Sequence, residues 1–208
     1  MLPQILIISI SSVSILIIYM IKKKYKKTLN QFTEDGKFYH QLISVDMKNF
    51  NCKPHLFEDN LCNKWCSLSY KKTLQKFISS ANLSICLCVY MLTLQSLNYE
   101  LLMAHKRGVI IRVITDKGMI QTKPVKAHLK KLKENGIPYK MQLSQQSMMH
   151  HKFCLIDKEN KELAKMFFGS LNLTSQGLHS NFDNIILTNN LNIIERFSEE
   201  FEELWNLF

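Results

Sequence analysis

At 208 residues, the chain can hold one membrane segment and one globular domain of ordinary size, and two full domains would be crowded. Lys and Arg outnumber Asp and Glu by 27 to 17, and the net charge of +10 predicts an anionic partner, either nucleic acid or acidic phospholipid. Three of the six cysteines, Cys86, Cys88 and Cys154, lie in apolar strand-like runs, which argues against a secreted disulfide framework and favours a reducing compartment.

The N-terminal stretch predicts a membrane anchor. Residues 5–21 form an apolar run broken only by serines, just long enough to cross a bilayer as a helix. Lysines follow this run directly, whereas a cleaved signal peptide carries its positive charge before the apolar stretch. Because the basic flank should stay in the cytosol, residues 1–27 are expected to anchor a cytosol-facing protein in the mitochondrial outer membrane or the endoplasmic reticulum. The alternative, a buried core helix, is disfavoured by the abrupt lysine boundary.

A cluster of cysteine and histidine follows a polar linker. Residues 28–50 predict this linker and a first strand near 38–45, and residues 51–67 predict a zinc-binding insert. The candidate zinc ligands are Cys52, His55, Cys62 and Cys66. Thiolates and imidazole form a tetrahedral ligand set for zinc. The alternative is a group of free thiols, because the spacing CxxHxxxxxxCxxxC is not one of the common zinc-finger patterns.

From residue 68 onward, the sequence predicts alternating helices and strands. Helical spacing of apolar residues covers 68–79, 94–107, 124–134 and 191–208. Strand-like runs cover 83–90, 109–115, 139–143, 152–156, 166–168 and 184–187. This alternation predicts an α/β fold, a sandwich in which helices flank a mixed, largely buried β-sheet, with 68–208 as the catalytic domain. No internal repeat is visible.

The strongest chemical signal lies in MHHKFCLID, residues 149–157, and in GSLN, residues 169–172. His150 and Lys152 are two positions apart at the start of a strand, so imidazole and ammonium point to the same face, while His151 points the other way. An imidazole can attack phosphorus, and a lysine and a carboxamide can neutralise the non-bridging oxygens. A turn at GSLN could bring Asn172 to the same place. The sequence therefore predicts a phosphodiester-cleaving site.

The pattern HxKxxxxD followed by GSxN resembles the phospholipase D superfamily. Together with the N-terminal anchor it is similar to the mitochondrial cardiolipin hydrolase branch, called Zucchini in insects, over residues 38–208. The resemblance implies a phospholipase D-like sandwich in which His150 is the nucleophile that forms a phosphohistidine. Lys152 and Asn172 would bind the phosphate. Asp183, in the segment NFDN, would orient the imidazole, and Asp157 would support the structure of the site rather than contact substrate.

Two positions depart from the family pattern. Leu173 stands where the family usually has a tryptophan, which would change a base or lipid contact but not the phosphate chemistry. The family's zinc ligands are three cysteines and a histidine that usually comes last, whereas His55 lies between the first two cysteines here. Zinc, if bound, would be structural, since the family's chemistry requires no metal.

The mechanism needs two histidines, one to attack and one to protonate the leaving oxygen, but the chain has one motif. A second candidate, His128-x-Lys130, ends in Asn135 instead of a carboxylate and lies in a helical, lysine-rich segment, so we expect a solvated helix face. The simplest solution is a twofold homodimer in which His150 of each subunit faces the other. The resemblance implies the same arrangement.

Three functions stay open at this point. The first is a single-strand-specific endoribonuclease at the mitochondrial surface, which the resemblance implies for piRNA precursors. A lysine-rich helix would be the rim of its groove, or else an ordinary solvated face; its lysines are Lys123, Lys126, Lys130, Lys131 and Lys133. The second is a phospholipase that hydrolyses cardiolipin to phosphatidic acid, favoured by the anchor but lacking an obvious apolar patch. The third, a non-catalytic membrane scaffold, has no need of His150, Lys152 and Asn172.

Overall fold

The computed structural model describes residues 17–24, 39–59, 61–143 and 147–208. Contacts divide the chain into two units, Met1–Tyr39 and His40–Phe208, and the second unit holds the fold described below. Most of the predicted anchor, 1–27, lies outside the described residues. Its described part, 17–24, is helical. Within the described ranges, no helix has both the length and the apolar character that a membrane crossing requires.

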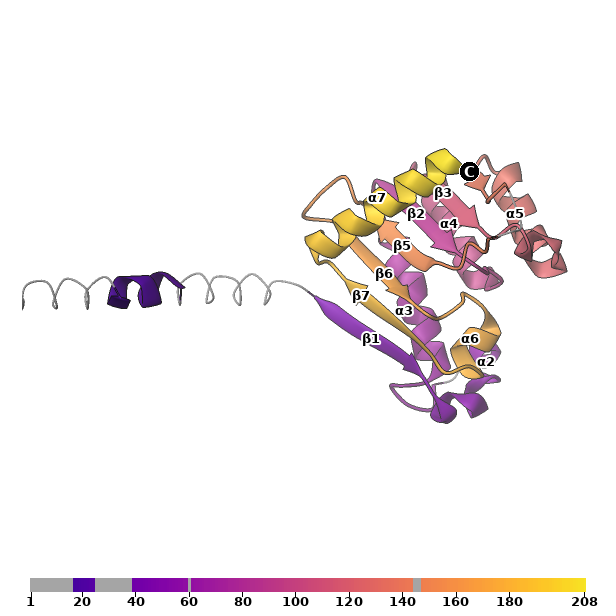
Figure 1. Cartoon of the computed structure of the whole chain (residues 1–208). Helices are drawn as coiled ribbons and strands as arrows, with labels where there is room; N and C mark the ends of the chain where they lie inside the picture. Colours follow the sequence, from indigo (N-terminus) through magenta and orange to yellow (C-terminus); the bar gives the residue numbers. More distant parts are fainter. Residues whose placement is uncertain (1–16, 25–38, 60, 144–146) are drawn as a thin grey trace, which may run out of the picture. The chain divides into compact units, whose positions relative to one another are not determined.

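The described part of His40–Phe208 is built on a seven-stranded mixed sheet with the strand order β1-β7-β6-β5-β2-β3-β4 (Figure 1). The strands are β1 His40–Val45, β2 Ser84–Val89, β3 Ile110–Thr115, β4 Tyr139–Lys140, β5 Lys152–Ile156, β6 Lys165–Gly169 and β7 Asp183–Thr188. Neighbours among β2, β3 and β4 run parallel, and all other neighbouring strands run antiparallel. Since β1 forms one edge of this sheet, the first strand belongs to the same unit as the remainder of the domain.

Helices cover both faces of the sheet. The helices are α2 His55–Glu58, α3 Ser67–Ser79, α4 Gln95–Lys106, α5 Lys123–Glu134, α6 Ser175–His179 and α7 Leu191–Leu207, with the 3-10 turns η1 Met47–Cys52 and η2 Met119–Gln121. Side chains of α3, α4 and α5 join one hydrophobic cluster on the sheet, and side chains of α7 join another. In Figure 1, α7 crosses the sheet on the face turned to the viewer, opposite to α3 and α4.

The central strands show why the sheet is buried on both sides. Every residue of β2 and β5 is buried. Along β5, Phe153 and Leu155 belong to the cluster under α7, while Cys154 and Ile156 belong to the cluster under α3 to α5. This alternation follows from the period of two in a strand. The predicted α/β sandwich with a mixed, largely buried sheet is therefore confirmed.

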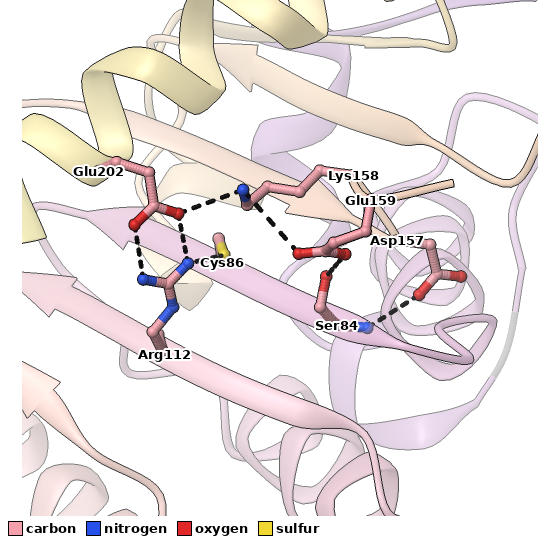
Figure 2. Close-up of polar contacts among 7 residues, drawn as sticks. All are labelled: Ser84, Cys86, Arg112, Asp157, Lys158, Glu159 and Glu202. Carbon is pink, nitrogen blue, oxygen red and sulfur yellow. Dashed lines mark hydrogen bonds and ion pairs between the residues drawn. The ribbon is translucent and has the colours of Figure 1, made fainter. Parts of the chain in front are cut away.

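A polar cluster fastens α7 to the sheet (Figure 2). Arg112 of β3 contacts the carboxylate of Glu202 at 2.5 Å and lies over the Phe201 ring, 5.0 Å from its centroid. Lys158, just beyond β5, reaches the same carboxylate at 3.1 Å. The hydrogen bond from Arg112 lowers the pKa of Glu202 to about 2. Burial acts in the opposite direction, and a hydrogen bond from Lys158 adds to the lowering. The helix is thus held by charge as well as by its apolar face.

The predicted elements from residue 68 onward are confirmed in order and type, but three expectations are wrong in detail. The predicted strand at 139–143 is reduced to β4, Tyr139–Lys140, and α6 was not expected. His128, expected on a solvated face, is only 8% exposed. The other buried residues of α5, at 125, 129 and 132, have the spacing of one helical face, and position 128 falls on that face.

Candidate functional site

The candidate site forms where β2 ends and β5 begins. Val89, the last residue of β2, pairs with Lys152, the first of β5, and the Tyr90 amide donates to the His151 carbonyl at 2.9 Å. The centroid of the Tyr90 ring lies 4.7 Å from that of His150 and 5.2 Å from Nζ of Lys152. Nζ of Lys152 also donates to the His150 carbonyl at 2.7 Å. The structure therefore brings together the two residues at the centre of the predicted site.

Lys152 is a buried cation. The residue is 5% exposed, and its ammonium forms no ion pair among the residues that the structure describes. Burial lowers the pKa of Lys152, and the negative charge of Asp183 acts in the opposite direction. An ammonium that is removed from water and lacks a carboxylate partner is a strong binding site for an anion.

His151 belongs to a different environment from that of His150. Its Nε2 lies 3.3 Å from Oε1 of Glu200 in α7, and its ring contacts Phe153 edge-to-face with the centroids 5.6 Å apart. The expectation that only the first of the two adjacent histidines shares a face with Lys152 agrees with this geometry. His151 helps to seat α7 on the sheet.

The GSLN turn lies beside the start of β5, because the register of β6 on β5 brings Gly169 there. A Cβ at Gly169 would lie 2.2 Å from the Asn184 carbonyl oxygen, so the close approach of the two backbones requires glycine. The Ser170 hydroxyl donates to Oδ1 of Asp183 at 2.7 Å, and Nδ2 of Asn181 donates to Oδ2 at 3.1 Å. One carboxylate oxygen of Asp183 thus fixes the turn, and the other accepts from the segment that precedes β7.

A backbone contact of the next residue holds Asn172 near the site. Leu173 donates its amide to the carbonyl of Met91 at 3.1 Å, and Met91 directly follows Tyr90. Oδ1 of Asn172 is buried and has no hydrogen-bond partner within the described ranges. Leu173 itself is 1% exposed and packs in the core, so this departure from the family pattern contributes to packing in this chain.

Asp157 lies at the other end of β5. It lies five positions after Lys152, or about 16 Å at roughly 3.3 Å per strand residue. The carboxylate is 1% exposed and accepts the amides of Leu83 at 2.7 Å and Ser84 at 3.0 Å, as the right side of Figure 2 shows for Ser84. Its backbone has φ 52°, in the left-handed region. Asp157 thus closes the loop before β2 and is not brought to the other site residues.

Asp116 is a residue of the site region that the sequence did not reveal. It ends β3, is 4% exposed, and accepts the Met149 amide at 3.1 Å and Nε2 of Gln142 at 2.5 Å on one oxygen. The other oxygen accepts the Gly118 amide at 2.8 Å. Asp116 therefore holds the segment that presents His150. The only signal in the sequence was an acidic residue directly after a buried parallel strand.

The four predicted zinc ligands converge. Their ligand atoms all lie within 4.8 Å of one another, with 3.7 Å between Sγ of Cys52 and Cys62 and 3.4 Å between Sγ of Cys66 and Nδ1 of His55. Tetrahedral zinc with ordinary bond lengths separates two sulfurs by about 3.8 Å and a sulfur from a nitrogen by about 3.6 Å. Burial acts to raise the pKa of Cys66, but hydrogen bonds, including one to His55, outweigh it and lower that pKa to about 6. The residues fit a structural zinc ion.

Comparison with known proteins identifies relatives. Residues 74–205 match the family described as cardiolipin synthase, PLD-like domain. The chain is 33% identical to the mitochondrial cardiolipin hydrolase of Drosophila melanogaster, over 71% of this chain and 63% of that protein. It is 31% identical to the protein of the same name from Danio rerio, over 66% of this chain and 57% of that protein. The matched region thus spans less than two thirds of either relative.

Solved structures share the fold. Nuc from Salmonella typhimurium, a phospholipase D family member, superposes with a TM-score of 0.63 and 20% identity, over 82% of this chain and 96% of Nuc. NucT from Helicobacter pylori gives a TM-score of 0.61 and 17% identity, over 82% of this chain and 97% of NucT. At these identities the likeness concerns the fold alone.

Proposed function

Because the chain belongs to the family of phospholipase D-like domains, we propose that it is a hydrolase that cleaves phosphodiester bonds through a phosphohistidine intermediate. The imidazole of His150 attacks phosphorus, the new P–N bond forms as the P–O bond to the leaving group breaks, and the leaving oxygen takes a proton. Water then attacks phosphorus, the P–N bond breaks as the new P–O bond forms, and the proton of the water passes to the group that protonated the leaving oxygen. Lys152 and Asn172 bind the non-bridging oxygens, where negative charge grows in the transition state, and Asp183 orients the imidazole.

The observation that carries this proposal is the buried ammonium of Lys152 beside His150, which forms no ion pair among the described residues. Both side chains contact the ring of Tyr90, so an anion bound at Nζ lies close to the imidazole. Asn172 adds a carboxamide whose Nδ2 can donate a hydrogen bond to a phosphate oxygen.

The leaving oxygen needs a general acid. His151, the adjacent histidine, is turned to Glu200, while His150 is exposed at the surface. We therefore propose a twofold homodimer in which His150 of each subunit faces the other, so that one attacks and the other donates the proton. The active site is then shared between two chains.

For the substrate, we propose single-stranded RNA, with piRNA precursors as the cellular target. The net charge of +10 and the exposed lysines of α5 favour a polyanion that extends beyond the reacting phosphate. The domain plan of the proposal is a membrane anchor at 1–27, a linker and first strand at 28–50, a zinc-binding insert at 51–67 and a catalytic domain at 68–208. The anchor, and relatives that are named mitochondrial, favour the mitochondrial outer membrane with the catalytic domain in the cytosol.

A second candidate function is the hydrolysis of cardiolipin to phosphatidic acid. Besides the names of the relatives, one feature of the structure favours it: a cavity of about 450 Å³ next to His150 has polar and apolar walls, and the apolar side chains include Met148, Leu204, Leu207 and Phe208. The sequence showed no obvious apolar patch beside the site, and these side chains supply an apolar wall there. An acyl chain would fit the chemistry of that cavity.

The test offers the purified full chain labelled single-stranded RNA and cardiolipin vesicles side by side. We expect RNA cleavage that is abolished by His150→Ala and retained by the matched variant His151→Ala. Turnover of cardiolipin without RNA cleavage would make cardiolipin the substrate in place of RNA. Unchanged cleavage by His150→Ala would refute the assignment of the nucleophile.

A further inference from the structure

A second cavity, of about 350 Å³, lies between α4 and α5. Its walls include Ser96, Asn98 and Tyr99 of α4 and His128 and Lys131 of α5. Its volume is within the range of about 300–1,000 Å³ that is usual for small-molecule sites. None of these residues takes part in the phosphodiester chemistry proposed above.

Unsatisfied polar atoms gather at this cavity. Among the described residues, Ser96 Oγ, Asn98 Oδ1 and His128 Nδ1 are buried without a hydrogen-bond partner. Asn98 is only 3% exposed and His128 only 8%. A buried polar atom without a partner costs about 1–3 kcal/mol, so three such atoms on residues that line one cavity favour a ligand there.

The character of these atoms defines the ligand. His128 is hydrogen-bonded through its ring to the backbone of Thr93, and burial, with the nearby charge of Lys131, lowers its pKa. The neutral imidazole therefore presents Nδ1 as an acceptor, and Oδ1 of Asn98 is an acceptor as well. Two acceptors attract N–H or O–H groups and repel phosphate oxygens, which only accept. The inner part of the cavity thus offers acceptors to the N–H groups of a base edge, which a phosphate lacks, and the Ser96 hydroxyl can donate or accept beside them.

The outer part of the cavity suits a nucleotide. Tyr99 is 57% exposed and offers an aromatic ring, on which a base can stack. Lys131 is exposed and can contact a backbone phosphate. The combination of a stacking ring, polar groups that meet the base edge and a cation for the backbone is how proteins bind unpaired nucleotides.

The cavity is connected to the catalytic site by a short stretch of chain. Tyr90, which contacts His150, precedes α4 by five residues, and such a stretch spans at most about 17 Å. The amides of Thr93 and Leu94 donate to the carbonyl of Leu173 at 2.9 and 3.1 Å, next to Asn172. A strand bound at the catalytic site could therefore reach the cavity within a few nucleotides.

We propose that the cavity between α4 and α5 is a nucleobase subsite, which holds one unpaired base of a single-stranded RNA whose phosphodiester bond is cleaved at His150. The choice of RNA rests on the function proposed above, while the base-binding property of the cavity rests on its own residues.

The experiment measures binding and catalysis separately in the full chain. Binding uses the His150→Ala protein, a labelled ten-nucleotide single-stranded RNA and the same ribose-phosphate backbone without bases. Tyr99→Ala, added to this protein, is expected to weaken RNA binding about tenfold, the typical loss for one stacked base, and binding of the abasic strand less than twofold. Ile110→Ala, which removes another exposed apolar side chain at the start of β3 and outside the cavity lining, should leave both affinities unchanged.

Catalysis is followed with bis(p-nitrophenyl) phosphate, a phosphodiester without a nucleobase. Tyr99→Ala in the otherwise wild-type chain should hydrolyse it at the wild-type rate, whereas a general structural defect would slow it. Equal loss of RNA and abasic binding, unchanged RNA binding, or Tyr99-dependent competition by cardiolipin vesicles would overturn the subsite. Base-dependent binding without RNA cleavage would instead refute the ribonuclease and leave the subsite standing.

Discussion

Replacing Lys152 by methionine tests the catalytic role proposed for its buried ammonium separately from the structural role. Methionine is unbranched and of similar length, so it can follow the path of the lysine side chain without its charge. The ammonium is expected to bind a non-bridging oxygen of the substrate. Loss of one such charge-stabilising group lowers the rate about 100- to 1,000-fold, or about 3–4 kcal/mol of transition-state stabilisation.

The free energy of unfolding should respond much less. The variant loses the hydrogen bond to the His150 carbonyl, 2.7 Å long, and the contact with the Tyr90 ring, which together contribute about 2–4 kcal/mol. It also loses the desolvation cost of a buried charge, which is visible as the lowered pKa of Lys152. Because these effects oppose each other, we expect the stability to change by less than about 2 kcal/mol.

The assay is hydrolysis of bis(p-nitrophenyl) phosphate, with urea unfolding of the same preparations. Lys165→Met is the matched control: burial also lowers the pKa of Lys165, and its ammonium lies 5.7 Å from the Phe77 ring centroid, but it occupies the opposite end of the neighbouring strand. The control should keep wild-type activity. Activity of Lys152→Met within tenfold of wild type, or equal losses in both variants, would refute the reasoning.

Three further predictions concern stability and metal. Asp157→Asn should lower the free energy of unfolding by about 2–3 kcal/mol in urea, because the amide replaces a buried carboxylate oxygen that accepts backbone amides; no change would contradict its role in closing the loop. The pKa of Glu202 is lowered to about 2, so its pairing with Arg112 stabilises the fold above about pH 4.5 and this stabilisation is lost as the pH falls toward 2. In Glu202→Gln, the free energy of unfolding that is lost on acidification through this window should be smaller by on the order of 1 kcal/mol, because solvent screens the partly exposed pair. An unchanged loss on acidification would contradict the pairing. Metal analysis should find about one zinc per chain. When Cys62 and Cys66 become serine, the zinc should be lost and the melting temperature should fall; a metal content unaffected by these changes would exclude the cluster as the zinc site.

The order and type of the elements could be predicted because local spacing determines them. The buried β-branched run of β3 and the amphipathic face of α7 are periodic patterns that need no tertiary information. The prediction of elements failed where the sequence signal was short or mixed, as for α6. The prediction of burial failed where one polar residue occupied an apolar stripe. His128 was assigned to solvent from its lysine-rich surroundings, although its spacing placed it on the buried face of α5.

The sequence by itself determined the chemistry of the site, because HxKxxxxD and GSxN are local patterns in which residue type and strand period specify what each group can do. Only the tertiary structure decided which groups meet. Strand pairing joins the ends of β2 and β5 and so brings Tyr90 to His150, whereas Asp157 lies at the other end of β5. Likewise, the contact of Asp116 with the Met149 backbone and the cavity between α4 and α5 arise from residues far apart in the chain, whose meeting no local pattern records.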